Sequence, residues 1–432
     1  RIMMFRDFVP DRVRVFLCLF FAVTFQFSGG IYLASVSQMV GSLALMQEDI
    51  MMAGYASFVG TTVVFPILFR LKFRFTSRSI FLMVCPALIV CNLITMSTGS
   101  LPVLVGVCFI AGMLRMWGTF ECLSSVQLSI TPTRNFAVFF PVVYLIQLSG
   151  LVTVYLGYWA DWRYMHGLII GLLLVVWLCA VLFTRHFRFM KALPLYGIDW
   201  LGGILWAIFL LALAFVFEYG KFYDWLYSPY IRSGIVVAVV ALLLNINRMH
   251  TLRHPYITKE ALGYRNMGAI LLAFLVLCCL QTTPTILQNI FTGSILKYDV
   301  LNSVSLNWWN LLGIVLGALA VYYWHARLHG GYKRAVFTGF ALIVIYQCFM
   351  YFLVYPRMNI EWLYLPTLLR GAGYVMIYIS LTVYISGFVP FQHFFQVLSL
   401  LGFVRTGFGS AFGRALYGRV MPHVLPAMSQ LL

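Results

Sequence analysis

The stretch HGLIIGLLLVVWLCAVLFT, residues 166–184, contains no Asp, Glu, Lys or Arg, and it stands between Arg163 and Arg185. A helix needs about 20 residues to cross a hydrocarbon core of about 30 Å. A chain in lipid must also satisfy its backbone hydrogen bonds internally, as a helix does. The stretch therefore predicts a membrane-spanning helix.

Similar apolar runs recur along the whole chain. Hydrophobic residues make up 62% of the sequence and charged residues only 9%, which is too little polar surface for a water-soluble domain. We expect an all-α polytopic membrane protein with about 13 transmembrane helices. The expected spans are 13–35, 50–69, 79–97, 102–128, 136–158, 166–184, 200–219, 229–247, 267–292, 302–324, 335–354, 362–388 and 392–418.

The basic residues divide unevenly between the two sides of these spans. Of the 29 Lys and Arg, 19 (Lys72 among them) fall in loops on the side of the N-terminus, seven on the opposite side and three inside spans. Because cytoplasmic loops carry the excess of basic residues, we expect a cytoplasmic N-terminus and a multi-pass protein of the inner (plasma) membrane. Basic residues spread over loops fit contact with the lipid bilayer, so no nucleic-acid partner is expected.

The two ends of the sequence suggest that it is trimmed. An odd number of spans would leave Arg414 and Arg419 on the outer side, and the chain begins at Arg1 without a methionine. We therefore expect a fourteenth helix outside this sequence.

Features of an enzyme are not visible. The longest polar connections, residues 185–199 and 248–266, are too short to form a folded domain of their own. The eight His lie at loop edges, and the nine Cys lie almost entirely inside apolar runs without metal-ligand spacing. We expect no enzymatic activity, no cofactor and no metal site.

Four charges lie inside spans, where ionisable residues are costly and usually functional. They are Arg115, Glu121, Arg370 and Arg405. Glu121 is the only carboxylate deep in a span, which makes it a candidate for proton coupling; alternatively it is a structural ion-pair partner or lies near the cytoplasmic mouth. Arg370 and Arg405 are candidates for the substrate cavity, although the glycines beside them also indicate close helix packing.

Uncharged polar residues add further candidates for the substrate cavity. In the ninth expected span, Gln281, Pro284, Thr285 and Gln288 repeat at helical spacing around a proline that frees backbone carbonyls. Hydrogen bonding between helices is the alternative role. The remaining candidates are Gln26 and Ser28 in the first span and Asn307, Trp308 and Asn310 in the tenth. Amides, hydroxyls and aromatic rings favour amphipathic organic molecules over metal ions as the small-molecule substrate.

Several motifs resemble the major facilitator superfamily, in particular its fourteen-helix EmrB/QacA-like drug:proton antiporter branch. Arg115 with Gly118 resembles that branch's Arg-x-x-x-Gly in helix four, one residue shorter. The other matching segments, in chain order, are GYWADWR at 157–163, IDWLGG at 198–203, EYGKFYDWLYSP at 218–229, PTILQ at 284–288 and RTGFGSAFG at 405–413.

The resemblance implies a six-helix bundle at 13–184, an inserted helix pair at 200–247 and a second bundle at 267–432. It further implies secondary transport by alternating access, with protons as the coupled ion and export of drug-like molecules. At Arg115 it implies a role in proton transfer; the alternative is an Arg that anchors its helix by hydrogen bonds to backbone carbonyls. A periplasmic adaptor protein is a further candidate partner.

The chain also departs from this family pattern. After the second span it has Phe73-Arg74-Phe75-Thr76, which keeps basic charge but lacks the acid and the glycine of the family's gating loop. Arg74 and Arg78 remain the gating-loop candidates, and Ser28 stands where the family often has a carboxylate. Two alternatives to proton-coupled export stay open: a carrier of a specific metabolite, coupled or uncoupled, and a non-transporting receptor of the same fold.

Overall fold

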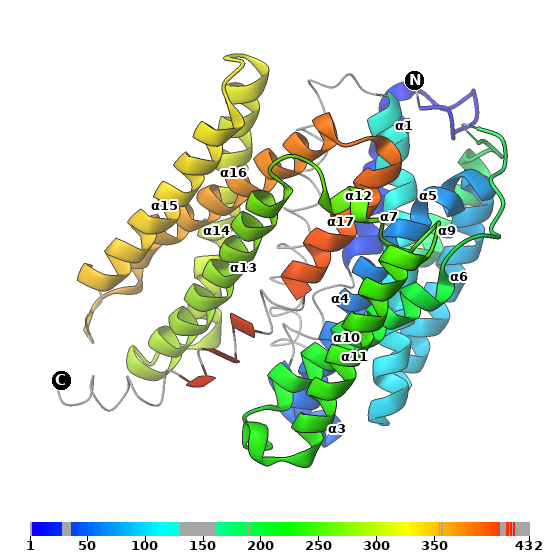
Figure 1. Cartoon of the computed structure of the whole chain (residues 1–432). Coiled ribbons are helices and arrows are strands. Elements are labelled where there is room, and N and C mark those ends of the chain that lie inside the picture. Colours follow the sequence, from blue (N-terminus) through cyan, green and yellow to red (C-terminus); the bar gives the residue numbers. More distant parts are fainter. Residues whose placement is uncertain are drawn as a thin grey trace.

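The computed structural model describes residues 2–27, 36–129, 161–188, 190–353, 355, 357–406, 412–413, 415–416 and 418–419. Within these ranges the chain is helical apart from turns and one isolated bridge between Phe5 and Thr184. In this described part of the chain, eight helices are long and apolar enough to cross a membrane, and the bent pair α4–α5 makes a ninth. The expectation of an all-α polytopic membrane fold is confirmed (Figure 1).

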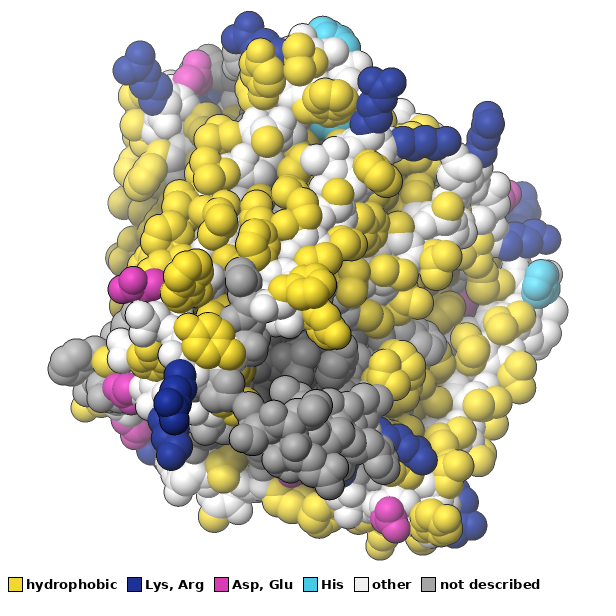
Figure 2. All heavy atoms as spheres, turned by 90° about the vertical axis from the view of Figure 1, so that its left-hand side faces the viewer, with side chains coloured by type: hydrophobic (Ala, Val, Ile, Leu, Met, Phe, Trp, Pro, Cys, Tyr) yellow, Lys and Arg dark blue, Asp and Glu magenta, His cyan; other side chains and the backbone are white. Residues whose placement is uncertain are grey.

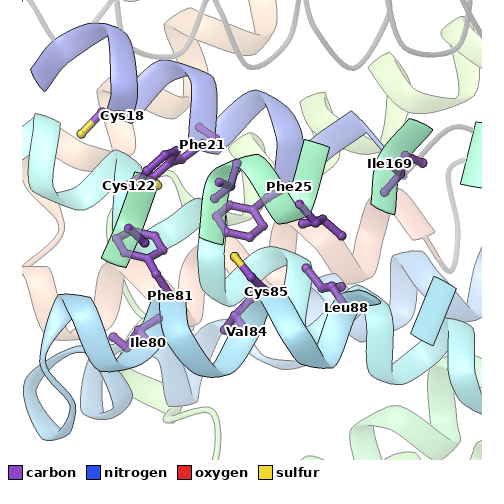
Figure 3. Close-up of a cluster of buried hydrophobic side chains, with 14 of the residues drawn as sticks. Cys18, Phe21, Phe25, Ile80, Phe81, Val84, Cys85, Leu88, Cys122 and Ile169 are labelled. Atoms are coloured by element: carbon purple, nitrogen blue, oxygen red, sulfur yellow. The ribbon is translucent and has the colours of Figure 1, made fainter. Parts of the chain in front are cut away.

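Most helices of the first group share one apolar core. Its elements are α1 (Asp11–Phe27), α3 (Val36–Leu43), α4 (Gln47–Val63), α5 (Phe65–Arg74), α6 (Ser77–Ser97), α7 (Leu101–Ser129) and α9 (Arg163–Phe183). Figure 3 shows how Phe21 and Phe25 of α1 meet Phe81 of α6, with Ile169 of α9 nearby. The rings of Phe21 and Phe81 lie edge to face at 5.3 Å, and Cys85 and Cys122 lie buried beside them as free thiols.

The second group follows after a helix pair. The pair is α10 (Trp200–Tyr219) and α11 (Pro229–Thr251), joined through η3 (Trp225–Tyr227). The later elements are α12 (Lys259–Leu262), α13 (Met267–Ile290), η4 (Phe291–Ile295), α14 (Val300–Ala326), α15 (Tyr332–Leu353), η5 (Ile360–Leu363), α16 (Tyr364–Phe388) and α17 (Phe391–Phe403). The division of the chain into 13–184, 200–247 and 267–432 stays a prediction.

The pair α10–α11 packs against helices from both groups. It contacts α4, and Trp206 of α10 stacks on Phe403 of α17 with ring centroids 4.9 Å apart. At the start of α10, Asp199 accepts a hydrogen bond from the N–H of Gly202 and pairs with Arg248 of α11. Burial alone would raise the pKa of Asp199, but these hydrogen bonds hold it below its ordinary value. A Cβ on Gly202 would collide with the Asp199 carboxylate, so a larger residue there would displace this carboxylate from its hydrogen bonds.

The expected second span, 50–69, is wrong as a single helix. It is two helices, α4 and α5, bent by 56°. Pro66 has no N–H to give to the carbonyl four residues earlier, that of Thr62, and kinks of this kind are common at proline. The hydroxyl of Ser399 in α17 donates to that carbonyl over 2.8 Å, and the hydroxyl of Tyr256 donates to the next one, that of Val63.

Glycines let several helices cross closely, as the small residues around Arg370 predict. A Cβ on Gly60 of α4 would collide with the backbone of α7, and one on Gly112 of α7 with the backbone of α4. Gly371 of α16 lies equally close to the backbone of Asn310 in α14. Four expected spans fall partly or wholly outside the described residues: the end of 13–35, all of 136–158, the last residue of 335–354, and most of the part of 392–418 that follows Thr406.

Connections rich in basic residues lie together at one end of the helices. The N–H of Arg6 donates to the carbonyl of Phe183 over 2.8 Å, the N–H of Arg185 to Met4 over 2.9 Å, and the N–H of Ser77 to Phe187 over 3.2 Å. In Figure 2, Lys and Arg side chains project from the upper edge above a broad apolar band, and in Figure 1 the N-terminus lies at this same end. The structure thus places these loops on one face, as the charge count predicts; which side of the membrane that face meets stays a prediction.

Candidate functional site

A cavity of about 200 Å³ lies between the two groups of helices. Its walls come from α1, α4, α5 and α7 on one side and from α13, α16 and α17 on the other. Ligand sites of drug-sized molecules start at roughly 300 Å³, so the space described here suits a small ligand. Three of the sequence candidates line it: Gln26, Arg115 and Arg405.

Two guanidinium groups carry the charge of this cavity. Arg115 comes from the middle of α7 and is 3% exposed, and its Nε has no hydrogen-bond partner among the described residues. Arg405 follows the end of α17 and lies over the ring of Phe58, with 5.5 Å between its Cζ and the ring centroid. The two guanidinium groups therefore reach one cavity from different groups of helices.

Most hydroxyls around the cavity give their hydrogen to their own helix. Thr61 donates to the carbonyl of Phe58, Thr62 to Val59, Thr119 to Arg115 and Thr382 to Tyr378. The amide of Gln26 donates to the hydroxyl of Thr119 over 2.9 Å, which joins α1 to α7. These hydroxyl oxygens keep acceptor capacity but have no hydrogen left to offer a ligand, so the guanidinium groups are the strongest donors in the lining.

Aromatic rings join the two groups of helices beside the cavity. Phe395 of α17 meets Phe120 of α7 edge to face at 4.8 Å and lies 6.1 Å from Phe69 of α5. Phe394 and Phe395 lie near the start of α17, next to the connections that carry the basic residues. Aromatic contacts thus hold α17 against α5 and α7 at that end of the cavity.

Glu121 does not line this cavity but takes part in a buried ion pair. Its Oε1 lies 3.3 Å from Nζ of Lys72 in α5 and accepts a hydrogen bond of 2.6 Å from the hydroxyl of Ser77, the first residue of α6. Assigning Lys72 to a loop is wrong, because the residue is in α5 and only 4% exposed. Glu121 lies six residues beyond Arg115, or about 9 Å along the axis, towards the end of α7 that meets Lys72 and Ser77.

A second polar cluster surrounds Arg370 in α16. Its Nη1 donates to Oε1 of Gln288 over 3.3 Å, its Cζ lies 5.4 Å from the ring centroid of Tyr346, and Tyr346 donates to the same Gln288 oxygen over 3.5 Å. Arg370 Nε and Asn310 Oδ1 are buried and have no hydrogen-bond partner among the described residues. Two predicted residues, Arg370 and Gln288, are thus brought together, but outside the 200 Å³ cavity.

The remaining sequence candidates are scattered. Asn307 and Trp308 are exposed on α14, Trp308 by 47%, and Gln281 is half-buried in α13. Arg74 ends α5 and Arg78 lies in the first turn of α6, so the expected gating loop shrinks to two residues between helices. Ser28 lies outside the described residues, as do the side chains of Pro284 and Thr285. Their roles stay predictions.

Sequence reasoning missed most of the cavity's apolar and hydroxyl lining. Phe58, Thr61, Phe120, Tyr378 and Phe394 all line it. In a chain with 17% aromatic residues such positions cannot be told from packing residues by type. Thr61 and Thr62, next to each other before Pro66, are the signal that would have drawn attention to this part of α4.

Comparison with known proteins gives a match in structure but not in sequence. No protein-family model matches the chain, and no curated protein sequence does. Among solved structures, the human organic anion transporter MFSD10 (TETRAN) superposes with a TM-score of 0.59 at 13% identity, covering 95% of this chain and 94% of that one. A mutant of the nucleoside transporter NupG superposes with a TM-score of 0.57 at 12% identity, covering 94% and 91%.

The chain has the major facilitator fold. At these identities the likeness concerns the fold alone, and the resemblance to the EmrB/QacA-like branch stays a prediction. The 200 Å³ cavity lies between the two groups of helices of this fold.

Proposed function

We propose that the chain is a secondary transporter that moves small amphipathic organic molecules across the inner membrane by alternating access. The observation that carries this proposal is the cavity between the two groups of helices, with Arg115 and Arg405 in its wall and aromatic rings around them. Such a site offers a polar anchor and apolar surface to one small molecule. The two groups of helices can rock about it so that it opens to either side in turn.

The structural neighbours support this proposal in general terms. Both are transporters of organic solutes, a nucleoside in one case and organic anions in the other. A small organic solute suits a cavity that combines guanidinium groups with aromatic rings.

Proton-coupled export is the form of transport we favour, with Glu121 as the group that takes up the proton. Glu121 Oε1 is held by Lys72 and Ser77, while its Oε2 is buried with no hydrogen-bond partner among the described residues. A proton on Oε2 would weaken the attraction to Lys72 and loosen α5 from α7. That motion would link protonation to the contacts that α17 makes with α5 and α7 beside the cavity.

The first test is transport in proteoliposomes that contain the purified chain. Labelled nucleosides, aryl carboxylates and lipophilic cations are supplied on one side, and their saturable accumulation is followed with and without a pH gradient. We expect saturable movement of one of these classes, driven by the pH gradient. Glu121→Gln should abolish that drive, and the fraction of this variant that stays folded should still carry out counterflow exchange of the same solute.

Other outcomes favour the alternatives. If the unchanged protein shows saturable exchange that does not depend on the pH gradient, an uncoupled carrier of a specific metabolite would be supported. A folded protein that binds a compound but moves none would support the non-transporting receptor.

A further inference from the structure

We propose that the substrate is an organic anion whose negative group is held between Arg115 and Arg405. The inference rests on the proposed transport function and names the substrate class of the same cavity. It predicts a carboxylate, sulfonate or phosphate on a small molecule whose remainder is largely apolar.

The first argument for an anionic substrate is that the cavity contains no acidic side chain. The chain has 12 Asp and Glu, and all of them lie in described residues: Asp7, Asp11, Glu48, Asp49, Glu121, Asp161, Asp199, Glu218, Asp224, Glu260, Asp299 and Glu361. None of these lines the cavity. The acid nearest in sequence to a cavity arginine, Glu121, is engaged by Lys72 and Ser77. The undescribed segments contain no Asp or Glu, so no acidic side chain of this sequence can balance the two guanidinium groups from there.

The second argument is the burial of a positive charge in the cavity wall. A buried charge is costly unless an opposite charge or several hydrogen bonds compensate it. Arg115 is 3% exposed and its Nε has no hydrogen-bond partner among the described residues. An anionic group in the cavity would supply the missing acceptor and the opposite charge, whereas a cation would add to the repulsion.

The third argument is that the cavity offers a ligand guanidinium donors together with apolar surface. Because Thr61, Thr62, Thr119 and Thr382 donate to carbonyls of their own helices, the guanidinium groups are the donors best placed to meet a ligand. Guanidinium groups bind planar carboxylates and phosphates with paired hydrogen bonds. The rest of the lining includes Phe58, Phe65, Phe120, Phe274 and Phe394, which suits an apolar body.

The test compares matched compounds that differ only in the head group. The probes are 4-phenylbutyrate, 4-phenylbutanol and 4-phenylbutylammonium, each titrated against the whole purified chain while its thermal unfolding is followed. A bound ligand raises the unfolding temperature by mass action, so the titration gives Kd without any transport. We expect the carboxylate to bind more tightly than the alcohol by tenfold or more, and the ammonium compound not to bind.

Variants separate charge in the cavity from charge elsewhere. Arg115→Gln and Arg405→Gln should each weaken carboxylate binding by about tenfold or more, as expected for the loss of a hydrogen-bonded charge. Arg405→Lys keeps the charge and should retain part of the affinity even if Arg405→Gln folds poorly. Arg327→Gln removes one positive charge from an exposed connection and serves as the matched control, with affinity unchanged.

Two results would overturn the inference: equal or tighter binding of the alcohol or the ammonium compound, or no binding of the carboxylate by the folded protein. Uptake of the same probes into proteoliposomes separates this failure from failure of the proposed function. Binding of the anion without uptake would contradict the transport proposal but would still support the anion site. Uptake of a neutral or cationic probe with no anion binding would support the transport proposal and contradict the anion site.

Discussion

Nζ of Lys72 and Oε1 of Glu121 are 3.3 Å apart, and each side chain is only 2% exposed. At the scale of single residues this pair is the feature that sequence reasoning could not supply. Glu121 stood out because it is an acid inside an apolar run, but Lys72 looked like a loop residue near the end of such a run. The two are separated by 49 positions, and no spacing rule joins residues so far apart.

Removing only one partner of this pair should be far more damaging than removing both. Lys72→Met leaves the Glu121 carboxylate buried without its cation, which costs about 3–5 kcal/mol in comparable buried pairs. Lys72→Met with Glu121→Gln removes both charges and should recover most of that loss. Thermal unfolding of the four proteins in one detergent measures the coupling. Lys191→Met, an exposed lysine, is the control. Additive effects of the two substitutions would show that the residues do not interact.

At the scale of elements, the apolar runs that a membrane requires made the limits of most helices predictable, but they gave little sign of the bend between α4 and α5. The expected span 200–219 coincides with α10, and 79–97 differs from α6 (Ser77–Ser97) by two residues at one end. Membrane thickness and flanking polar residues decide these limits, so sequence alone suffices. The bend at Val64 was missed because apolar residues continue across it, and only Pro66 signals it.

The broken helix gives a prediction about two distant elements. Ser399→Ala removes the donor that satisfies the Thr62 carbonyl, and a lost hydrogen bond to a buried backbone group costs about 1–3 kcal/mol. In a Pro66→Ala background, residue 66 regains an N–H that can bond to the same carbonyl, so Ser399→Ala should cost less there. Unfolding temperatures of the single and double variants test this. Ser233→Ala, an exposed hydroxyl that donates to its own helix, is the control. An equal cost of Ser399→Ala in both backgrounds would contradict this account of the bend.

At the scale of the whole molecule, charge and fold agree on which loops share a face. The contacts of Arg6 with Phe183 and of Ser77 with Phe187 draw three connections together on the face where the basic residues concentrate. Figure 1 shows the α14–α15 connection at the same end as the N-terminus and the α10–α11 connection at the opposite end. Arg327 lies in the former and Lys221 in the latter, and both are exposed.

Because cytoplasmic loops carry the excess of Lys and Arg, we expect Arg327 inside the cell and Lys221 outside. Single cysteines test this in a Cys348→Ser background, since Cys348 is the one exposed native thiol among the nine cysteines. In intact cells a membrane-impermeant maleimide should label Lys221→Cys at once, and Arg327→Cys only after the membrane is opened. Labelling in the reverse order would show that the protein has the opposite orientation in the membrane. It would place the Lys72–Glu121 pair at the outer end of the cavity, and the proposed proton uptake by Glu121 would then start from the external solution.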